Sequence, residues 1–299
     1  MEHISADLPV FDGHIHLQPG SCPAPAEFMK RAEAAGVDGG FLFSLAPYRY
    51  RQLPEAADWR QRLDFILEFT SQTPGFYPFF WIDPLADDVQ KQVETAVEKG
   101  IAGFKVICST FYPEEGMKCY HAIAEAGKPL TFHCGGLWSE NVSNKYNQPT
   151  NFEVLATVPG LRVALAHFGW PWCDELVALY GKFIYLNNNG FTARLYLDST
   201  PGASGIYRAD VIRKFFFCCA YAGDRCFFGS DARMNNYSAK TLSLLKAMDR
   251  PIFENLADDF SKISFPPEVS VFNYENQDDI YDRVFRKNYK NFLYGEDNK

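Results

Sequence analysis

The architecture of this chain can be inferred from the stretch IAGFKVICSTFYPEEGMKCYHAIAEAGKPLTFHC, residues 101–134. Two short apolar runs, 101–108 and 128–134, have the composition of buried strands, and the segment 114–127 between them has that of a helix. This segment ends at Gly127, and glycine suits the left-handed conformation common at helix ends. The order of strand, helix and strand predicts two parallel strands joined by a crossover helix.

The same pattern repeats along most of the 299 residues. Eight strand-like runs are predicted, at 9–14, 38–45, 75–83, 101–108, 128–134, 161–167, 182–188 and 224–231. The predicted helices between or after them are 25–35, 58–72, 87–99, 114–127, 150–157, 171–180, 208–222 and 238–249. One strand–helix unit takes roughly 31 residues, close to the size expected of a βαβ repeat. Eight units predict an α/β fold of the (β/α)8 TIM-barrel type, with a doubly wound open sheet as the alternative.

The C-terminal part of the chain departs from this repeat. Residues 251–299 contain a Pro-Pro pair and an amphipathic segment, IYDRVFRKNYKNFLY, at 280–294. We therefore expect a single domain spanning residues 1–299, in which residues 251–299 form a helical extension packed on the barrel.

Composition excludes several classes of protein. Hydrophobic residues make up 47% of the chain and aromatic residues 16%, which is enough for a packed core and atypical of disordered chains. The net charge of −8 offers no attraction to nucleic acid or to anionic membranes. The N-terminal stretch lacks a signal-peptide pattern, and the eight cysteines form no CxxC pair. We expect a cytoplasmic protein with a small-molecule substrate and without nucleic-acid or membrane partners; a homo-oligomer is compatible with the sequence.

Four of the six histidines lie at predicted strand ends. His14 and His16 end the first run, His133 the fifth and His167 the sixth. Because all strands of a parallel barrel end at one face, these side chains should converge there. His14 and His16 are two residues apart, so both point to the same side of the strand. Asp231, at the end of the eighth run, should lie beside the first strand once the barrel closes.

Imidazole nitrogens and a carboxylate oxygen in this pattern are suited to a divalent metal. Zinc, or another divalent ion such as manganese, would be held by neutral histidines and one carboxylate, with a position open for water. The alternative is that each histidine is a hydrogen-bonded structural residue, which is common for a single histidine at a strand end. The convergence of four histidines in a histidine-poor chain favours the metal site.

Six motifs occur in a characteristic order: FDGHIHL (11–17), GFKVI (103–107), PLTFHCG (129–135), VALAHFGW (163–170), FFGSDA (227–232) and RKNYKNFLYG (286–295). This set resembles the strand-end motifs of the amidohydrolase superfamily, specifically the amidohydrolase-2 branch of metal-dependent TIM-barrel hydrolases and decarboxylases. The resemblance spans roughly residues 9–294. It implies metal ligands at His14, His16 and Asp231, with His133 as the next ligand. It also implies that His167 either binds a second metal or contacts the bound water or substrate.

Lys105, in the fourth run, bears on the number of metal ions. In binuclear members of the wider superfamily, a fourth-strand lysine is carboxylated and bridges two metals. The alternative is that Lys105 supports the ligands or contacts the substrate. A lysine buried inside a barrel needs a partner or a lowered pKa, so a purely solvated role is disfavoured. The sequence leaves one or two ions open.

A metal at this site would lower the pKa of its water to about 7 and polarise a carbonyl. Asp231 is the predicted proton shuttle, and His167 would stabilise the developing oxyanion or hold a second metal. These roles predict a hydrolase that cleaves an amide, ester or lactone bond. A metal-dependent non-oxidative decarboxylase of a small carboxylic acid is the alternative enzyme. A binding or sensing barrel without catalysis is the alternative from another class.

Loops after the strands should select the substrate. The predicted contacts are Arg49 after the second strand, Trp138 after the fifth, Trp170 after the sixth and Arg233 after the eighth. Arginine suits a carboxylate or phosphate, and aromatic side chains suit a ring. A small acidic molecule with an apolar or ring portion is therefore the predicted substrate. The alternative is that these arginines form only weak surface ion pairs.

Overall fold

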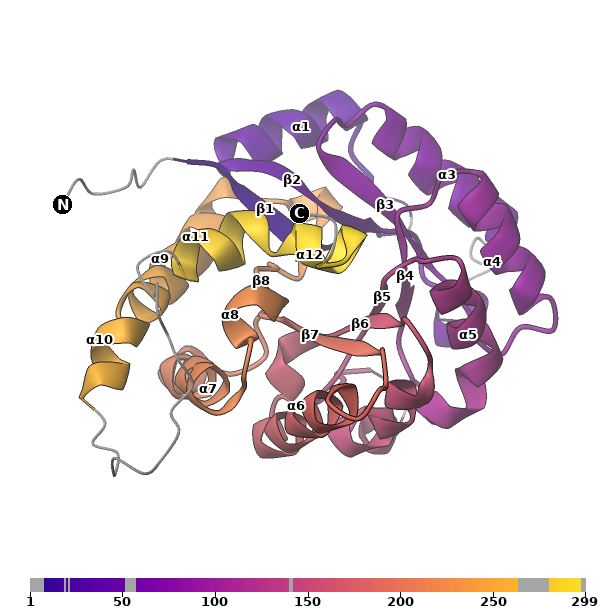
Figure 1. Cartoon of the computed structure of the whole chain (residues 1–299). Helices are drawn as coiled ribbons and strands as arrows, with labels where there is room; N and C mark the ends of the chain where they lie inside the picture. Colours follow the sequence, from indigo (N-terminus) through magenta and orange to yellow (C-terminus); the bar gives the residue numbers. More distant parts are fainter. Residues whose placement is uncertain are drawn as a thin grey trace.

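The computed structural model describes residues 8–18, 20, 22–51, 58–139, 142–262 and 280–296. Its centre is a parallel sheet with the strand order β8-β7-β6-β5-β4-β3-β2-β1-β9, and helices lie outside the curled sheet (Figure 1). The strands are β1 Val10–His16, β2 Val37–Phe43, β3 Phe76–Trp81, β4 Gly103–Val106, β5 Leu130–Phe132, β6 Arg162–Leu165, β7 Arg194–Asp198, β8 Cys226–Phe227 and β9 Ala232–Arg233.

The sheet closes through the segment that contains β8 and β9. β8 pairs with β7, and β9 pairs with β1. Just after β8, the carbonyl of Phe228 accepts a hydrogen bond of 2.8 Å from the backbone N–H of Gly13 in β1. β8 and β9 together therefore fill the eighth position, between β7 and β1. The predicted TIM-barrel architecture is confirmed.

Most of the helices cover the outer face of the barrel (Figure 1). In the part of the chain that the structure describes, the α-helices are α1 Pro25–Ala34, α2 Tyr48–Arg51, α3 Trp59–Ser71, α4 Val89–Glu98, α5 Met117–Glu125, α6 Cys173–Asn187, α7 Gly205–Cys218, α8 Ala222–Arg225, α9 Ala239–Glu254, α10 Leu256–Ser261, α11 Ile280–Asp282 and α12 Tyr289–Tyr294. The segment predicted as a helix at 150–157 is a 3₁₀ helix, Pro149–Thr157. In the described part of the chain, no helix has the length and apolar character needed to cross a membrane.

The seventh strand was expected at 182–188, and that prediction is wrong. Most of this run belongs to α6, and the strand at the seventh position is β7, a little further along the chain. The helix buries Leu176, Leu179, Tyr180 and Phe183, a spacing of three and four residues that places them on one helical face. The apolar run at 182–188 thus continues a helical pattern that begins before it.

The C-terminal helix α12 packs against the end of the barrel where the strands begin. Phe292 of α12 is fully buried, and its ring centroid lies 5.2 Å from that of Phe227 and 5.3 Å from that of Tyr196. Arg162, the first residue of β6, donates from Nε to the carbonyl of Phe292 at 2.8 Å. α12 therefore lies across this end of the barrel (Figure 1). That residues 1–299 form a single domain stays a prediction.

Candidate metal centre

The five predicted ligands lie at the opposite end, where the strands finish. His14 and His16 end β1, and His133 directly follows β5. His167 lies in the 3₁₀ helix after β6, and Asp231 directly precedes β9. All five positions share this end because every paired strand runs parallel to its neighbour.

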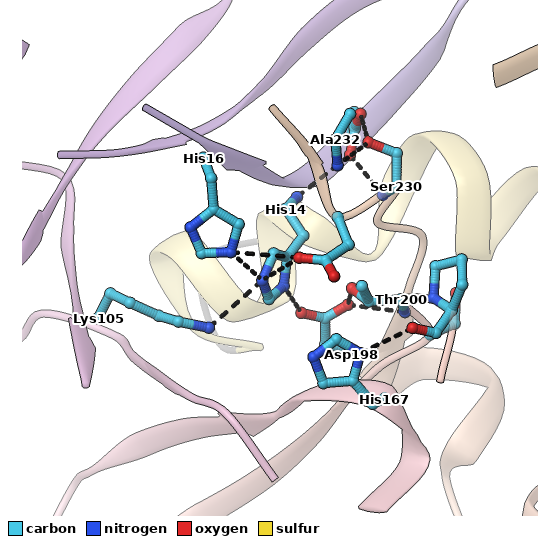
Figure 2. A network of polar contacts seen from close by, with 12 residues as sticks. His14, His16, Lys105, His167, Asp198, Thr200, Ser230 and Ala232 are labelled. Atoms are coloured by element: carbon cyan, nitrogen blue, oxygen red, sulfur yellow. Dashed lines mark hydrogen bonds and ion pairs between the residues drawn. The ribbon is translucent and has the colours of Figure 1, made fainter. Parts of the chain in front are cut away.

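His14, His16 and Asp231 form the tightest group. The two Nε2 atoms of His14 and His16 are 3.1 Å apart. Oδ1 of Asp231 lies 3.2 Å from Nε2 of His16 and 3.5 Å from Nε2 of His14. One ligand atom from each residue lies within 4.8 Å of the others, so the three could hold a metal ion. Figure 2 shows the rings of His14 and His16 turned toward each other.

Asp198 is a residue of the candidate site that the sequence prediction missed. Its Oδ2 lies 2.5 Å from Nδ1 of His14, and both side chains are buried. The other oxygen, Oδ1, accepts hydrogen bonds from the backbone N–H of Thr200 at 3.0 Å and from the Thr200 hydroxyl. A carboxylate paired with Nδ1 keeps the proton there and leaves the Nε2 lone pair of His14 for a metal.

The signal for Asp198 was present in the sequence. β7 reads RLYLD, an apolar run that ends in a carboxylate, as expected of a strand reaching the mouth of the barrel. It was overlooked because the seventh position was assigned to 182–188.

The protonation of His14 also suits metal binding. Burial and the neighbouring Lys105 charge lower the pKa of His14 well below its ordinary value, and this outweighs the opposing effect of Asp231. The ring is therefore neutral at neutral pH, which is the form that binds a metal.

Asp231 is held in a restricted conformation. Its φ is 58°, in the left-handed region that few non-glycine residues adopt. The preceding residue, Ser230, donates from its backbone N–H to Oδ1 of Asp12 at 2.8 Å and from its hydroxyl to Oδ2 at 2.5 Å. The Tyr237 hydroxyl donates to the same Oδ2 at 2.8 Å. Asp12, from β1, thereby anchors the backbone that carries Asp231.

The electrostatic surroundings keep Asp231 ionised. Burial would raise its pKa, but the hydrogen bond with His16 and the electrostatic interaction with the neighbouring imidazoles lower it by a larger amount. The Asp231 side chain is nevertheless 42% exposed and lines the cavity described below. It is therefore an accessible carboxylate.

His133 and His167 lie beside the three-residue cluster. Their ring centroids are 4.7 Å apart. Nδ1 of His167 lies 2.9 Å from the carbonyl oxygen of Pro201, which fixes this nitrogen as a donor. Nε2 of His133 is buried and has no hydrogen-bond partner among the described residues. Two successive left-handed residues, His167 with φ 62° and Phe168 with φ 50°, turn the chain at this point.

Lys105 approaches the cluster from β4. Its side chain is fully buried, and Nζ lies 3.4 Å from Nε2 of His14 and 4.7 Å from the centroid of the Phe43 ring. Burial lowers the pKa of Lys105 to about 8, although the charges of Asp198 and Asp231 oppose this. Among the described residues, no carboxylate oxygen lies within 4.0 Å of Nζ.

A cavity of about 330 Å³ opens at this end of the barrel. Of the predicted substrate contacts, Trp138, Trp170 and Arg233 line it. Arg49 is not among the lining residues; its Nε binds the Asp83 carboxylate at 2.8 and 2.9 Å. The structure therefore pairs Arg49 with a protein carboxylate rather than bringing it to the site.

Other side chains complete the wall of the cavity. Trp81 and Tyr50 line one side, with ring centroids 4.8 Å apart. Trp81 ends β3 and was not predicted, although its place at a strand end is the signal that identified the histidines.

Known proteins resemble this chain in sequence and in fold. A family model described as amidohydrolase matches residues 11–263. An uncharacterised TIM-barrel protein from Bordetella bronchiseptica has a similar structure, with a TM-score of 0.61 and 16% identity, over 96% of this chain and 98% of that chain. A protein from Pseudomonas putida assigned as a 2-pyrone-4,6-dicarboxylic acid hydrolase has a TM-score of 0.58 and 15% identity, over 97% and 98% of the two chains.

No curated protein matches the chain. The structural similarities are at low sequence identity and establish the shared fold. The family match covers most of the chain, including the strand-end residues described above. The chain therefore belongs to the amidohydrolase family of TIM-barrel proteins.

Proposed function

We propose that this chain is a metal-dependent hydrolase that cleaves an amide, ester or lactone bond in a small acidic molecule. The observation that carries the proposal is the His14–His16–Asp231 cluster at a cavity of about 330 Å³. The cavity is of a size that suits a small molecule. Membership of the amidohydrolase family supports a hydrolytic reaction.

The donors fit zinc or a similar divalent ion. Two imidazole nitrogens and one carboxylate oxygen form a suitable ligand set. The Asp198 carboxylate directs the Nε2 lone pair of His14 into this set. An ion bound there would polarise a carbonyl and acidify a water molecule.

We assign proton transfer to Asp231. Its carboxylate lies beside His16 and lines the cavity, where it would accept a proton from the attacking water and pass it to the leaving group. The role of His167 would depend on whether its ring is neutral or charged. With Nδ1 donating to Pro201, the neutral ring offers an Nε2 lone pair to a second metal, and the charged ring offers an N–H to an oxyanion.

The charges around the cavity favour an acidic substrate. Lys105 and Arg233 line it, and Asp231 is the acidic side chain among the lining residues described. Trp81, Trp138 and Trp170 supply apolar surface that suits a ring.

Metal analysis and product analysis test the proposal. Protein purified without added zinc should contain a divalent metal. It should hydrolyse at least one compound in a panel of lactones, esters and amides of small carboxylic acids. A chelator should abolish this hydrolysis, and zinc, manganese or cobalt should restore it. Absence of bound metal, together with no gain of hydrolysis on adding these ions, would overturn the proposal. Release of carbon dioxide without hydrolysis would identify the decarboxylase instead.

A further inference from the structure

Lys105 is a buried cation at the base of the cavity. It lines the cavity, yet its side chain has 0% exposure in the structure. Its hydrogen-bond partner among the described residues is Nε2 of His14, at 3.4 Å, and the face of Phe43 lies on another side. A buried ammonium with few hydrogen-bond acceptors is costly, so a further acceptor would stabilise the charged form of Lys105.

The His14 contact depends on a single lone pair. Because Nδ1 of His14 carries the proton donated to Asp198, Nε2 has one lone pair to offer. Lys105 donates to that lone pair in the structure. A metal ligated by Nε2 would use the same lone pair. Metal binding would therefore leave the three N–H donors of Lys105 without this acceptor.

The neighbouring carboxylates are already engaged. Asp198 accepts from His14 with one oxygen and from Thr200 with the other. Oδ1 of Asp231 faces both histidines of the cluster. Neither carboxylate lies within ion-pair distance of Lys105 among the described residues. Lys105 also lines the cavity, so a molecule bound there could supply a further acceptor.

We propose that Lys105 binds a carboxylate of the substrate next to the bond that is cleaved. The inference rests on the proposed function and narrows the substrate class. Since Nζ lies 3.4 Å from a nitrogen of the metal cluster, a carboxylate held by Lys105 is only a few bonds from a carbonyl at that cluster. The substrate is thus an amide, ester or lactone whose carboxylate is close to the scissile carbonyl.

A carboxylate matches this subsite better than a phosphate group. One ammonium balances one negative charge, whereas a phosphate monoester carries about −1.5 to −2 at pH 7. Arg233 also lines the cavity, but it is exposed at the mouth and follows the cluster in β9. Lys105 is fully buried and therefore interacts with an anion in a less screened environment.

Benzoate and benzamide provide matched probes, because they share a ring and a similar shape and differ in charge. Binding is measured by quenching of tryptophan fluorescence, since three tryptophans line the cavity, on protein of known zinc content before and after loading with zinc. Wild-type, zinc-loaded protein should bind benzoate at least about tenfold more tightly than benzamide. Lys105→Met should remove this preference and should bind zinc as tightly as wild type or more tightly.

Lys99→Met is the control, because it removes the same charge from an exposed ion pair with Asp64. It should leave the preference intact. Thermal unfolding checks the fold, and Lys105→Gln replaces Lys105→Met if the apolar variant does not fold. The inference is wrong if Lys105→Met keeps the benzoate preference, or if Arg233→Gln removes it instead. It is also wrong if Lys105→Met loses zinc, which would make Lys105 part of the metal site, or if inorganic phosphate binds at Lys105 more tightly than benzoate.

The experiments distinguish a failure of this inference from a failure of the proposed function. If the protein takes up no metal and does not hydrolyse the panel, the hydrolase proposal fails, and the Lys105-dependent preference for benzoate can still be measured. If metal-dependent hydrolysis is found without a Lys105-dependent preference, the hydrolase proposal stands and this inference fails.

Discussion

His14 and Asp198 are joined by a contact of 2.5 Å between Nδ1 and Oδ2, across 184 positions of the sequence. One end of the His14 ring thus faces a buried carboxylate while the other faces the candidate metal cluster. The pair links β7 to β1 and sets which ring nitrogen can bind a metal.

Replacing Asp198 should weaken metal binding. Asp198→Asn keeps the shape of the side chain but removes the charge that favours the Nδ1–H tautomer of His14. We expect zinc affinity to fall about 10- to 100-fold, measured by competition with a chromogenic chelator. Asp174→Asn, at an exposed carboxylate paired with Lys214, should leave zinc affinity unchanged. Equal zinc affinity in the Asp198 variant and wild type would contradict the role assigned to the pair.

The proton-transfer role of Asp231 can be separated from its backbone strain. Asparagine tolerates the left-handed conformation, so Asp231→Asn should fold normally despite the φ of 58° at this position. Turnover should fall by about 100- to 10 000-fold, and steady-state kinetics would measure this. His14→Ala should likewise abolish turnover, whereas His121→Ala, on α5, should retain it. A near-normal rate for either site variant would refute the role given to that residue.

A buried ion pair supports the loop after β7. Arg208 binds Asp249 through two contacts of 2.8 and 2.6 Å, and it also donates to the carbonyl of Ser199 at 2.5 Å. Asp249→Asn leaves the arginine charge uncompensated and should lower the free energy of unfolding by about 3–5 kcal/mol in urea denaturation.

The exposed pair between Lys214 and Asp174 is the control for this measurement. Lys214→Met should change the free energy of unfolding by less than about 1 kcal/mol. A similar decrease in the free energy of unfolding in both variants would show that burial does not increase the contribution of the Arg208–Asp249 pair to stability.

The C-terminal extension should make stability dependent on acid pH. Arg225 binds Glu296 at 2.6 Å. Burial raises the pKa of Glu296, but the hydrogen bond and charge of Arg225 lower it by a larger amount. The pKa of Glu296 therefore lies below its ordinary value of 4.5. The stabilisation is therefore complete above the unfolded-state pKa and is lost as the pH falls through the lower folded-state pKa.

Glu296→Gln should lower the free energy of unfolding by about 1 kcal/mol at pH 7. The difference from wild type should shrink as the pH falls below about 4.5, because protonation then removes the same charge from wild type. Urea denaturation over this pH range measures both curves. A difference that stays constant with pH would show that the charge of Glu296 is not responsible.

Much of the site could be predicted because its residues occupy strand ends. The spacing of His14 and His16 places both side chains on one side of a strand, whatever the rest of the chain does. His133 and Asp231 follow from the repeat of strands and helices, since parallel strands finish at one face. Small errors in strand boundaries leave that face unchanged.

The seventh strand could not be assigned from local pattern alone. An apolar run at 182–188 suits a strand or a helix, and the difference depends on residues earlier in α6 that share its buried face. Because that assignment displaced β7, the prediction of the site lacked Asp198.

Sequence periodicity and motif order predicted the barrel repeat and the types of side chain in the candidate metal cluster, because both depend on local side-chain spacing. Folding decided which distant groups meet: Asp198 with His14, Asp12 with Ser230, and Lys105 with the cluster. These contacts join strands through the curvature and register of the closed sheet, on which local periodicity carries no information. The pairing of Arg49 with Asp83 away from the cavity lining has the same origin.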